Sequence, residues 1–497
     1  MKRLKGTPQS LLLVIFVLMA TAVLPAISAC TMGTQTPLER VLRIIGVEDP
    51  LSPEAVRELD RFDQVYREYA SDPQDRERLE YFGFAFKRLR AGYVRPVSDS
   101  DLIDAAIKGV TEKEPKPGSL APTELVETAL QSMVTSLDPH SAYLNEEQFR
   151  ESFVHTTGEF GGLGIEVTMA DGLIKVVAPI EDTPAFRAGL VSGDLITHVD
   201  GEAIKGKSLL EAVRRMRGAA GTDILLRVRR DSVPDFDLTI TRAIIKVKAV
   251  KWETEGNVGY IRVTRFSEKL EHGIEQAFED IDNRLGDGLS GVVLDLRNNP
   301  GGLLDQSIIL SDAFLNAGEI VSVRGRSPES NRSYGAAEGD IANGKPIVVL
   351  INEGSASASE IVASALKFHR RATVMGTRSF GKGSVQTIMP LLPVGGALRL
   401  TTALYYAPSG ETIQARGVQP DIILKPEETD KRQRETDLPG SFPALGNGES
   451  RDRPAVSLNV CPAAGVKEDR QLGCALAFLA SGSADKFLAS YGGDQHM

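Results

Sequence analysis

The stretch from Lys345 to Thr387 constrains the fold more than any other part of the chain. An apolar, β-branched run, Ile347 to Ile351, ends at an Asn-Glu-Gly turn, and small residues then lead into the segment Glu360 to Phe368. Apolar residues in that segment recur at helical spacing. The pattern predicts a strand, a tight turn and a helix. Further strands are expected at 372–376 and 385–389, before and after a Gly-Lys-Gly loop.

This local architecture suits a nucleophilic serine. A serine at the N-terminus of a helix lies beside unpaired backbone N–H groups, which favour negative charge developing on a carbonyl oxygen. Four serines compete for the role, and they are Ser355, Ser357, Ser359 and Ser364. The alternative is structural, because Ser357 and Glu360 also fit the S-x-x-E capping box, in which the serine only satisfies an amide of the first turn.

Two separated motifs narrow the choice. They are Gly-Ser-Ala-Ser-Ala-Ser-Glu-Ile at 354–361 and Phe-Gly-Lys-Gly-Ser-Val-Gln at 380–386. In content and in spacing they resemble the C-terminal processing peptidases, also called tail-specific proteases. The resemblance implies that Ser357 is the nucleophile, that Lys382 is the general base, and that Gln386 orients the lysine.

A lysine can act as a base only in its neutral form. The free side chain has a pKa of about 10.4, and burial can lower that value by roughly 3 units. No acidic residue lies between Thr373 and Ala407, which permits a lowered pKa for Lys382. The alternatives are a solvated surface lysine or a phosphate ligand, but Gly383 stands where a P-loop needs a hydroxyl group.

A third motif, Asp-Leu-Arg-Asn-Asn-Pro-Gly-Gly at 295–302, lies between an expected strand and a helix expected at 303–315. It resembles the oxyanion loop of the same family. The resemblance implies that the N–H group of Gly301 or Gly302 joins that of Ala358 in holding the oxyanion. The sequence does not separate the two glycines, and a tight strand-to-helix turn is the structural alternative. One such donor is typically worth about 10²- to 10³-fold in rate.

Three motifs follow one another between residues 155 and 246. They are Phe-Gly-Gly-Leu-Gly-Ile-Glu-Val at 160–167, Pro-Ala-Phe-Arg-Ala-Gly-Leu at 184–190, and Gly-Asp-Leu-Ile-Thr-His-Val-Asp-Gly at 193–201. Together they resemble a PDZ domain. Successive N–H groups in a Gly-rich turn can capture the terminal carboxylate of a peptide, while the adjacent strand pairs with the peptide. The expected ligand-binding residues are Gly162, Leu163, Gly164 and Ile165.

The N-terminus carries export signals. Basic residues precede an apolar run from Leu11 to Leu24, as in a secretory signal peptide. The run is shorter than the roughly 20 residues of a spanning helix, although an uncleaved anchor reaching Ala29 stays open. Ile-Ser-Ala-Cys at 27–30 resembles a bacterial lipobox, which implies cleavage before Cys30 and a lipid on that cysteine. We therefore expect a membrane-anchored protein of the cell envelope or periplasm.

The resemblance implies an α+β multidomain chain with a crotonase-like α/β protease core. The expected parts are a signal peptide and lipobox at 1–30, a helical N-terminal region at 37–150, a PDZ domain at 155–246, the protease core at 247–425, a polar linker at 426–455 and a C-terminal segment at 456–497. Ser-Leu-Asp-Pro-His-Ser-Ala-Tyr-Leu at 136–144 resembles the family segment that follows the helical region. The polar composition of 426–455 predicts an exposed or disordered linker.

Composition limits the kinds of partner and cofactor that the protein is expected to bind. A formal net charge of −10 and a pI near 5.4 argue against a nucleic-acid partner. None of the six histidines falls in a zinc motif, so no metal or cofactor is expected. Cys461 and Cys474 could pair in an oxidising compartment. The resemblance implies protein or peptide substrates with apolar C-termini and an activating adaptor protein, and a homo-oligomer stays open.

The family resemblance covers residues 93–425. It implies an exported serine endopeptidase that recognises substrate C-termini through its PDZ domain and cleaves with a Ser/Lys dyad. Two alternatives stay open. One is a catalytically silent PDZ adaptor in which Ser357 only caps a helix, and the other is a protease that needs a partner for activation.

Overall fold

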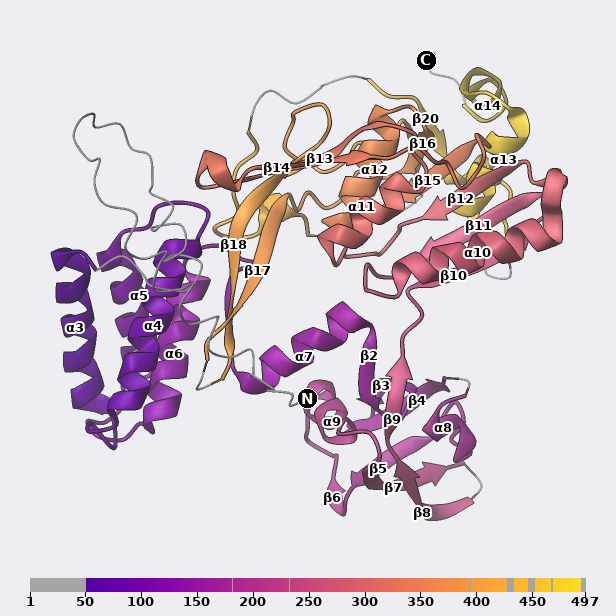
Figure 1. The fold of residues 1–497 in the computed structure, drawn as a ribbon. Helices are drawn as coiled ribbons and strands as arrows, with labels where there is room; N and C mark the ends of the chain where they lie inside the picture. The colour runs from indigo at the N-terminus through magenta and orange to yellow at the C-terminus, as the bar shows by residue number, and fades with distance from the viewer. Residues whose placement is uncertain are drawn as a thin grey trace, which may run out of the picture. The chain divides into compact units, whose positions relative to one another are not determined.

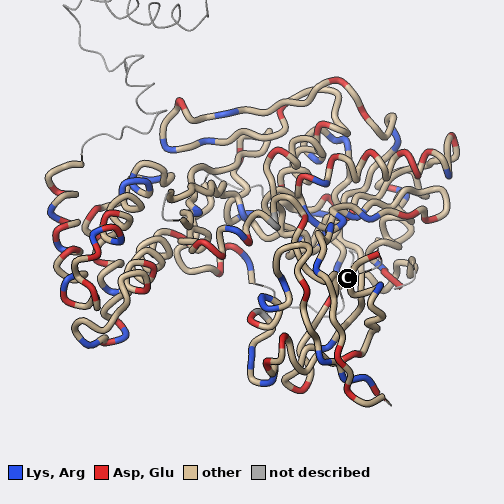
Figure 2. Tube along the Cα trace, turned by 60° about the horizontal axis from the view of Figure 1, so that its bottom comes forward, with Lys and Arg blue, Asp and Glu red and all other residues tan. Residues whose placement is uncertain are grey.

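The computed structural model describes residues 51–180, 182–231, 233–392, 395–426, 433–445, 452–465 and 468–492 (Figure 1). The expected signal peptide, the lipobox with Cys30 and the start of the helical region lie outside these ranges. Within the described ranges, no helix is both long enough and apolar enough to cross a membrane. Lys and Arg are interspersed with Asp and Glu along the trace (Figure 2).

The described chain begins with a helical region. Its elements are α3 (Pro53–Tyr69), α4 (Arg76–Gly92), α5 (Asp99–Thr111), α6 (Pro122–Thr135), the short strand β1 (Ala142–Leu144) and α7 (Glu146–Thr157). Asp75 and Ser98 cap α4 and α5, because each side chain accepts an amide of the first turn. Phe62 and Phe82 are fully buried and stack with ring centroids 3.7 Å apart, which joins α3 to α4.

Residues 159–246 form a β-rich domain with its own apolar core. Its elements are β2 (Glu159–Gly162), β3 (Ile165–Ala170), β4 (Leu173–Pro179), α8 (Pro184–Arg187), β5 (Leu195–Val199), β6 (Glu202–Ala203), α9 (Leu209–Met216), β7 (Asp223–Arg230), β8 (Val233–Thr241) and β9 (Ala243–Lys246). The main sheet has the order β3-β4-β5-β7-β8, β6 pairs with β5, and β2 pairs with β9. Leu163, Ile174 and Leu226 are buried in its core.

A seven-stranded sheet organises the region after residue 249. In spatial order its strands are β10 (Val250–Glu255), β11 (Val258–Val263), β12 (Gly291–Asp295), β15 (Ile347–Ile351), β16 (Ala372–Gly376), β19 (Ile422–Lys425) and β20 (Ala455–Ser457). Only β10 runs antiparallel to its neighbour. β12 and β15 are buried along their whole length, which explains their continuous apolar sequences.

Helices pack on both faces of this sheet. They are α10 (Leu270–Leu285), extended by the 3-10 turn η1 (Gly286–Gly288), α11 (Leu304–Asp312), α12 (Ala358–Phe368), α13 (Arg470–Ser481) and α14 (Ala484–Tyr491). Ile261 of β11 packs in a cluster with Phe278 of α10, whereas its neighbour Tyr260 belongs to a second cluster with Phe487 of α14. Alternate residues of a strand face opposite sides. The C-terminal residues 455–491 therefore add a strand and a covering layer to the core sheet, and the 3-10 turn η4 (Leu458–Val460) joins these two parts.

A second sheet positions the loop that carries Lys382. Its strands are β1, β18 (Ala397–Tyr406), β13 (Gly318–Gly325) and β14 (Arg332–Ala336), and β17 (Ser384–Pro390) also pairs with β18, while the 3-10 turn η2 (Pro328–Ser330) connects β13 to β14. β17 begins two residues after Lys382 and runs antiparallel to β18, with Ser384 opposite Leu404. The loop is thus held by a strand on its C-terminal side.

Most residues at 433–445, within the predicted linker 426–455, are exposed, but two of them are buried. Glu435, in the 3-10 turn η3 (Glu435–Asp437), is fully buried. Phe442 is also buried, and its ring centroid lies 6.5 Å from that of Tyr93. The Arg95 guanidinium lies 4.1 Å from the Phe442 centroid. Composition could not indicate these two buried residues, because their partners come from distant parts of the chain.

Candidate active site

Three of the four candidate serines are bound to backbone carbonyls. Each hydroxyl group donates a hydrogen bond to a carbonyl oxygen: Ser355 to Leu296 (2.8 Å), Ser359 to Asn299 (2.9 Å) and Ser364 to Ile361 (3.0 Å). Ser357 differs in its backbone. It is the N-cap of α12 and has φ 54° and ψ −113°, a backbone conformation that residues with a side chain rarely adopt. Such a conformation costs about 1–3 kcal/mol and clusters at functional sites. Backbone strain therefore singles out Ser357.

Tyr405 of β18 contacts the same serine. Its phenol hydrogen-bonds with the Ser357 side chain, and burial raises the pKa of Tyr405 to about 12. The phenol therefore stays neutral near pH 7. The Tyr405 amide donates to the carbonyl of Gly383 at 2.7 Å, so one residue links β18 to both motifs. The sequence gives Tyr405 no role, because nothing in an apolar strand marks the residue that meets a distant serine.

Lys382 is mostly enclosed in the loop before β17. Burial, assisted by the charge of Arg399, lowers the pKa of Lys382 to about 8, although Glu435, Asp138 and Glu360 act in the opposite direction. At pH 7 about one lysine in ten is then neutral. The sequence permits this shift, and the structure supplies its cause.

One carboxylate joins the nucleophile turn to the lysine loop. Glu360 is fully buried, and its Oε2 accepts the N–H of Ser357 at 2.7 Å and the N–H of Lys382 at 3.0 Å. Its Oε1 accepts the Ser379 hydroxyl at 2.5 Å and the Gly381 N–H at 2.7 Å. The sequence predicts only the first of these bonds, as part of a capping box. The other three are tertiary contacts, which bring the two motifs together.

Gln386 belongs to a polar chain that starts at the 136–144 motif. The Gln386 Nε2 donates to Ser384 Oγ at 2.9 Å and to Thr401 Oγ1 at 3.2 Å. Thr401 in turn donates to Asp138 Oδ1 at 3.1 Å, and Asp138 is buried. The 136–144 motif, which resembles the family segment after the helical region, thus holds the Gln386 amide through Thr401.

Glu435, a buried residue in the largely exposed segment 433–445, connects to the same loop. Glu435 Oε1 accepts Gln414 Nε2 at 2.7 Å, and Glu435 Oε2 lies 2.7 Å from His140 Nε2. Gln414 Oε1 accepts the N–H of Gly383 at 2.9 Å, immediately after Lys382. A segment that looks like a linker in the sequence therefore supports the lysine loop.

Gly301 packs directly against the nucleophile turn. A Cβ atom on Gly301 would lie 2.9 Å from Ser357 Cβ and 3.0 Å from the Ala358 nitrogen, and its φ is +98°. Only glycine fits such a position without strain. The Gly301 N–H donates to Asn299 Oδ1 at 2.9 Å, so this donor is already engaged.

Gly302 is arranged differently. The carbonyl of Gly301 accepts the N–H of Phe266 at 3.2 Å. In a trans peptide the following N–H, that of Gly302, points the opposite way from this carbonyl. Within the described ranges, the N–H groups of Gly302 and Ala358 have no protein acceptor.

A buried ion network anchors the oxyanion loop on the C-terminal layer. Arg297 donates to Asp295 at 2.7 Å and to Asp469, the N-cap of α13, at 2.6 Å. A disulfide between Cys461 and Cys474, a pairing that the sequence leaves open, fastens the preceding turn to α13. The C-terminal segment thus supports the site as well as the sheet.

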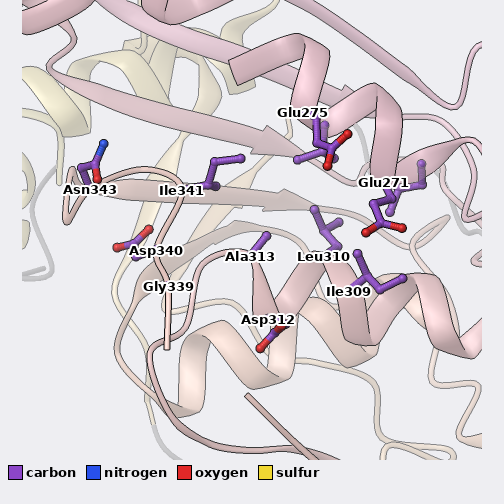
Figure 3. Close-up of a pocket in the computed structure, with 12 residues that line it drawn as sticks. Glu271, Glu275, Ile309, Leu310, Asp312, Ala313, Gly339, Asp340, Ile341 and Asn343 are labelled. Atoms are coloured by element: carbon purple, nitrogen blue, oxygen red, sulfur yellow. The ribbon is translucent and has the colours of Figure 1, made fainter. Parts of the chain in front are cut away.

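A hollow of about 540 Å³ lies between α10, α11 and the loop 339–343 (Figure 3). Acidic side chains surround an apolar floor, but two of them already have partners in the protein. Asp340 pairs with Arg371, and Asp312 accepts the N–H of Ala337 at 2.6 Å. None of the predicted site residues lines this hollow, so it is separate from the candidate active site.

Comparison with known proteins decides the family. The model of peptidase family S41 matches residues 257–424, and the PDZ domain model matches residues 161–238. A carboxy-terminal-processing protease of Bartonella bacilliformis is 52% identical over 351 residues, which cover 70% of this chain and 75% of the relative. The chain belongs to peptidase family S41. This S41 peptidase is a carboxy-terminal processing serine protease with a PDZ domain.

Two further known proteins are similar to the S41 peptidase. The carboxy-terminal processing protease CtpA of Bacillus subtilis is 34% identical over 341 residues, covering 68% of this chain and 67% of the relative. Among solved structures, the photosystem II D1 C-terminal processing protease matches 70% of the S41 peptidase and 93% of its own chain, with 29% identity and a TM-score of 0.46.

These findings confirm three predictions about the S41 peptidase. They are the family resemblance, the α+β multidomain fold with a PDZ domain and a protease core, and the assignment as a serine-type peptidase. Membership in a family of peptidases favours an enzyme over the silent PDZ adaptor.

Proposed function

We propose that this peptidase is an exported endopeptidase that cleaves with a Ser357/Lys382 dyad. The observation that carries the proposal is the shared Glu360 oxygen, which holds the backbone of a strained serine beside the backbone of a lysine of lowered pKa. Neutral Lys382 takes the proton of Ser357 Oγ as this oxygen attacks the scissile carbonyl. The resulting ammonium protonates the leaving amine, and the lysine then activates the water that hydrolyses the acyl-enzyme.

Gln386 positions the lysine in this proposal. Its amide nitrogen donates to Ser384 and Thr401. An amide has one donor end and one acceptor end, so fixing the nitrogen also fixes the oxygen. The Gln386 oxygen is then the end that accepts from the Lys382 ammonium.

The N–H groups of Ala358 and Gly302 hold the oxyanion. Ala358 directly follows the nucleophile, and Gly302 directly follows Gly301, which packs against Ser357 Cβ and has its own N–H engaged by Asn299. The sequence leaves Gly301 and Gly302 as alternatives, and this hydrogen bond is our reason for choosing Gly302. Each such donor contributes about 10²- to 10³-fold to the rate.

The PDZ domain recruits the C-termini of substrates through the loop of Gly162, Leu163, Gly164 and Ile165. Hydrogen bonds hold two carbonyls of this loop. The Leu163 carbonyl accepts the N–H of Ala185 at 2.9 Å, and the Gly164 carbonyl accepts the Thr183 hydroxyl at 3.0 Å. A loop fixed through its carbonyls can present its N–H groups to a carboxylate.

Amidating the C-terminus of an apolar peptide is expected to weaken its binding by about 10- to 100-fold, because hydrogen bonds to a charged group are worth about 1.5–3 kcal/mol. Calorimetry with the Ser357→Ala protein measures the two affinities without cleavage. Gly164→Ala should abolish the difference, because its Cβ would lie 2.3 Å from Thr183 Cβ. Gly172→Ala is the matched control, with a positive φ but no close contact. Equal affinity for acid and amide in the unsubstituted loop would rule out carboxylate capture.

Export and lipid anchoring complete the proposal. The Cys461–Cys474 disulfide supports an oxidising compartment. In a bacterial host, the mature chain is expected to begin at Cys30, to carry a lipid mass on that residue, and to sediment with membranes. Cys30→Ser should lose the lipid mass, whereas Met32→Ala should keep it. Membrane binding that does not depend on Cys30 would argue for an uncleaved anchor instead.

The activating adaptor and the homo-oligomer stay predictions. Cleavage of an unfolded protein by the pure chain 31–497, with no other protein present, would exclude an obligatory adaptor. Sedimentation of the same sample measures the number of chains in the particle.

A further inference from the structure

Helix capping explains only part of what Glu360 does. A capping box needs the bond between the Glu360 carboxylate and the N–H of Ser357. The bonds to Ser379, Gly381 and Lys382 come from a separate loop and contribute nothing to the helix end. A carboxylate with two oxygens and several lone pairs can accept all four donors, and no other side chain of this size can.

We propose that Glu360 is a positioning residue that aligns the nucleophile with its base. The inference rests on the Ser357/Lys382 dyad proposed above. Glu360 reaches the reacting atoms only through the backbones of Ser357 and Lys382, each bonded to the same Oε2. A shift of either backbone by about 1 Å can cost about 10²-fold in rate, because proton transfer depends on the distance between the two side chains.

The surroundings of Glu360 favour this role over a purely electrostatic one. The charged groups near it are Arg378 and Lys382, both on the loop 378–382. Arg378 donates to the carbonyls of Ala415 and Arg416, so its guanidinium is held by the backbone. Burial raises the pKa of Glu360 to about 7, and the hydrogen bonds from Ser379, Ser357, Gly381 and Lys382 oppose this shift. The four donors therefore favour the ionised form, which burial disfavours.

Two substitutions separate alignment from charge. Glu360→Ala removes all four bonds. Glu360→Gln removes the charge but keeps one acceptor oxygen, and its NH₂ group can donate only to the Ser379 hydroxyl, since the other three donors are backbone N–H groups. The amide oxygen then faces Ser357 and Lys382, and the link between their backbones survives.

The experiment compares the pH dependence of kcat and KM for the wild type, both Glu360 variants, and Glu279→Gln as an exposed charge control on α10. Glu360→Ala should lower kcat by about 10²-fold with an unchanged KM. Glu360→Gln should retain at least about tenfold more activity than Glu360→Ala. The acid limb of its pH profile, the part in which kcat rises with pH, should move to lower pH. Loss of a negative charge near Lys382 lowers the pKa of the lysine. Glu279→Gln should match the wild type.

The inference is overturned if Glu360→Ala keeps kcat within about twofold of the wild type, or if Glu360→Gln loses as much kcat as Glu360→Ala. Should Glu360→Ala fail to fold, kcat of Glu360→Gln carries the test alone: a value within about tenfold of the wild type supports alignment, and a larger loss overturns it. Activity lost in Ser357→Ala and Lys382→Ala but retained in Glu360→Ala would sink this inference only. Full activity of Ser357→Ala would sink the dyad on which it rests.

Discussion

Ser357→Ala is expected to lower the rate at which the protein cleaves an unfolded substrate with an apolar C-terminus by at least about 10⁴-fold. The substitution removes the attacking oxygen, and no acyl-enzyme can form. Alanine keeps the Cβ atom and hence the strained φ of 54°, so the turn and α12 should be preserved. Steady-state cleavage and thermal unfolding, measured on the same preparation, separate loss of chemistry from loss of fold.

Ser355→Ala and Ser359→Ala are the matched controls. Each removes a buried hydroxyl that donates to a backbone carbonyl, of Leu296 or Asn299, and each carbonyl keeps one backbone N–H donor. We expect each to lower the free energy of unfolding by about 1–3 kcal/mol while the folded protein still cleaves. A Ser357→Ala protein that cleaves as fast as the wild type would show that the nucleophile lies elsewhere.

The second large effect concerns Lys382. Lys382→Ala should lower kcat/KM by about 10²- to 10⁴-fold, the usual contribution of a general base. Lys382→Arg should be equally inactive, because a guanidinium keeps the charge and does not deprotonate. Lys248→Ala, at an exposed lysine, should retain full activity.

The pH profile of the wild type tests the same assignment. The neutral lysine is the active form, and the pKa of Lys382 is lowered to about 8. Below that pH the neutral fraction falls about tenfold per unit, so log kcat/KM should rise with a slope near one and level off above pH 8. An acid limb centred near the pKa of a free lysine, about 10.4, would contradict a buried base.

Local sequence accounts for much of the scaffold around the site. The β-branched run of β15, the glycine turn and the helical spacing of α12 each have a physical signature that does not depend on the rest of the chain. The Pro-Gly-Gly turn before α11 is readable for the same reason. Family resemblance adds the roles of Ser357 and Lys382.

The supports of the site could not be predicted in this way. Tyr405 meets Ser357, Thr401 meets Gln386, and Glu435 supports the lysine loop through contacts between segments far apart in sequence. Polar and charged residues at 426–455 favour an exposed linker by composition, and the buried partners of Glu435 override that tendency. Glu360 was readable as a helix cap, whereas its three bonds to the lysine loop required the folded chain.

The most direct test of the dyad is to locate the acyl group. A peptide ester substrate is mixed with the wild type at pH 8, the reaction is quenched in acid, and the acylated peptide of the protein is sequenced by mass spectrometry. The account predicts a single acyl group on Ser357, with a rate of formation that falls in Lys382→Ala and below pH 8. An acyl group on Ser355, Ser359 or any residue other than Ser357 would contradict it.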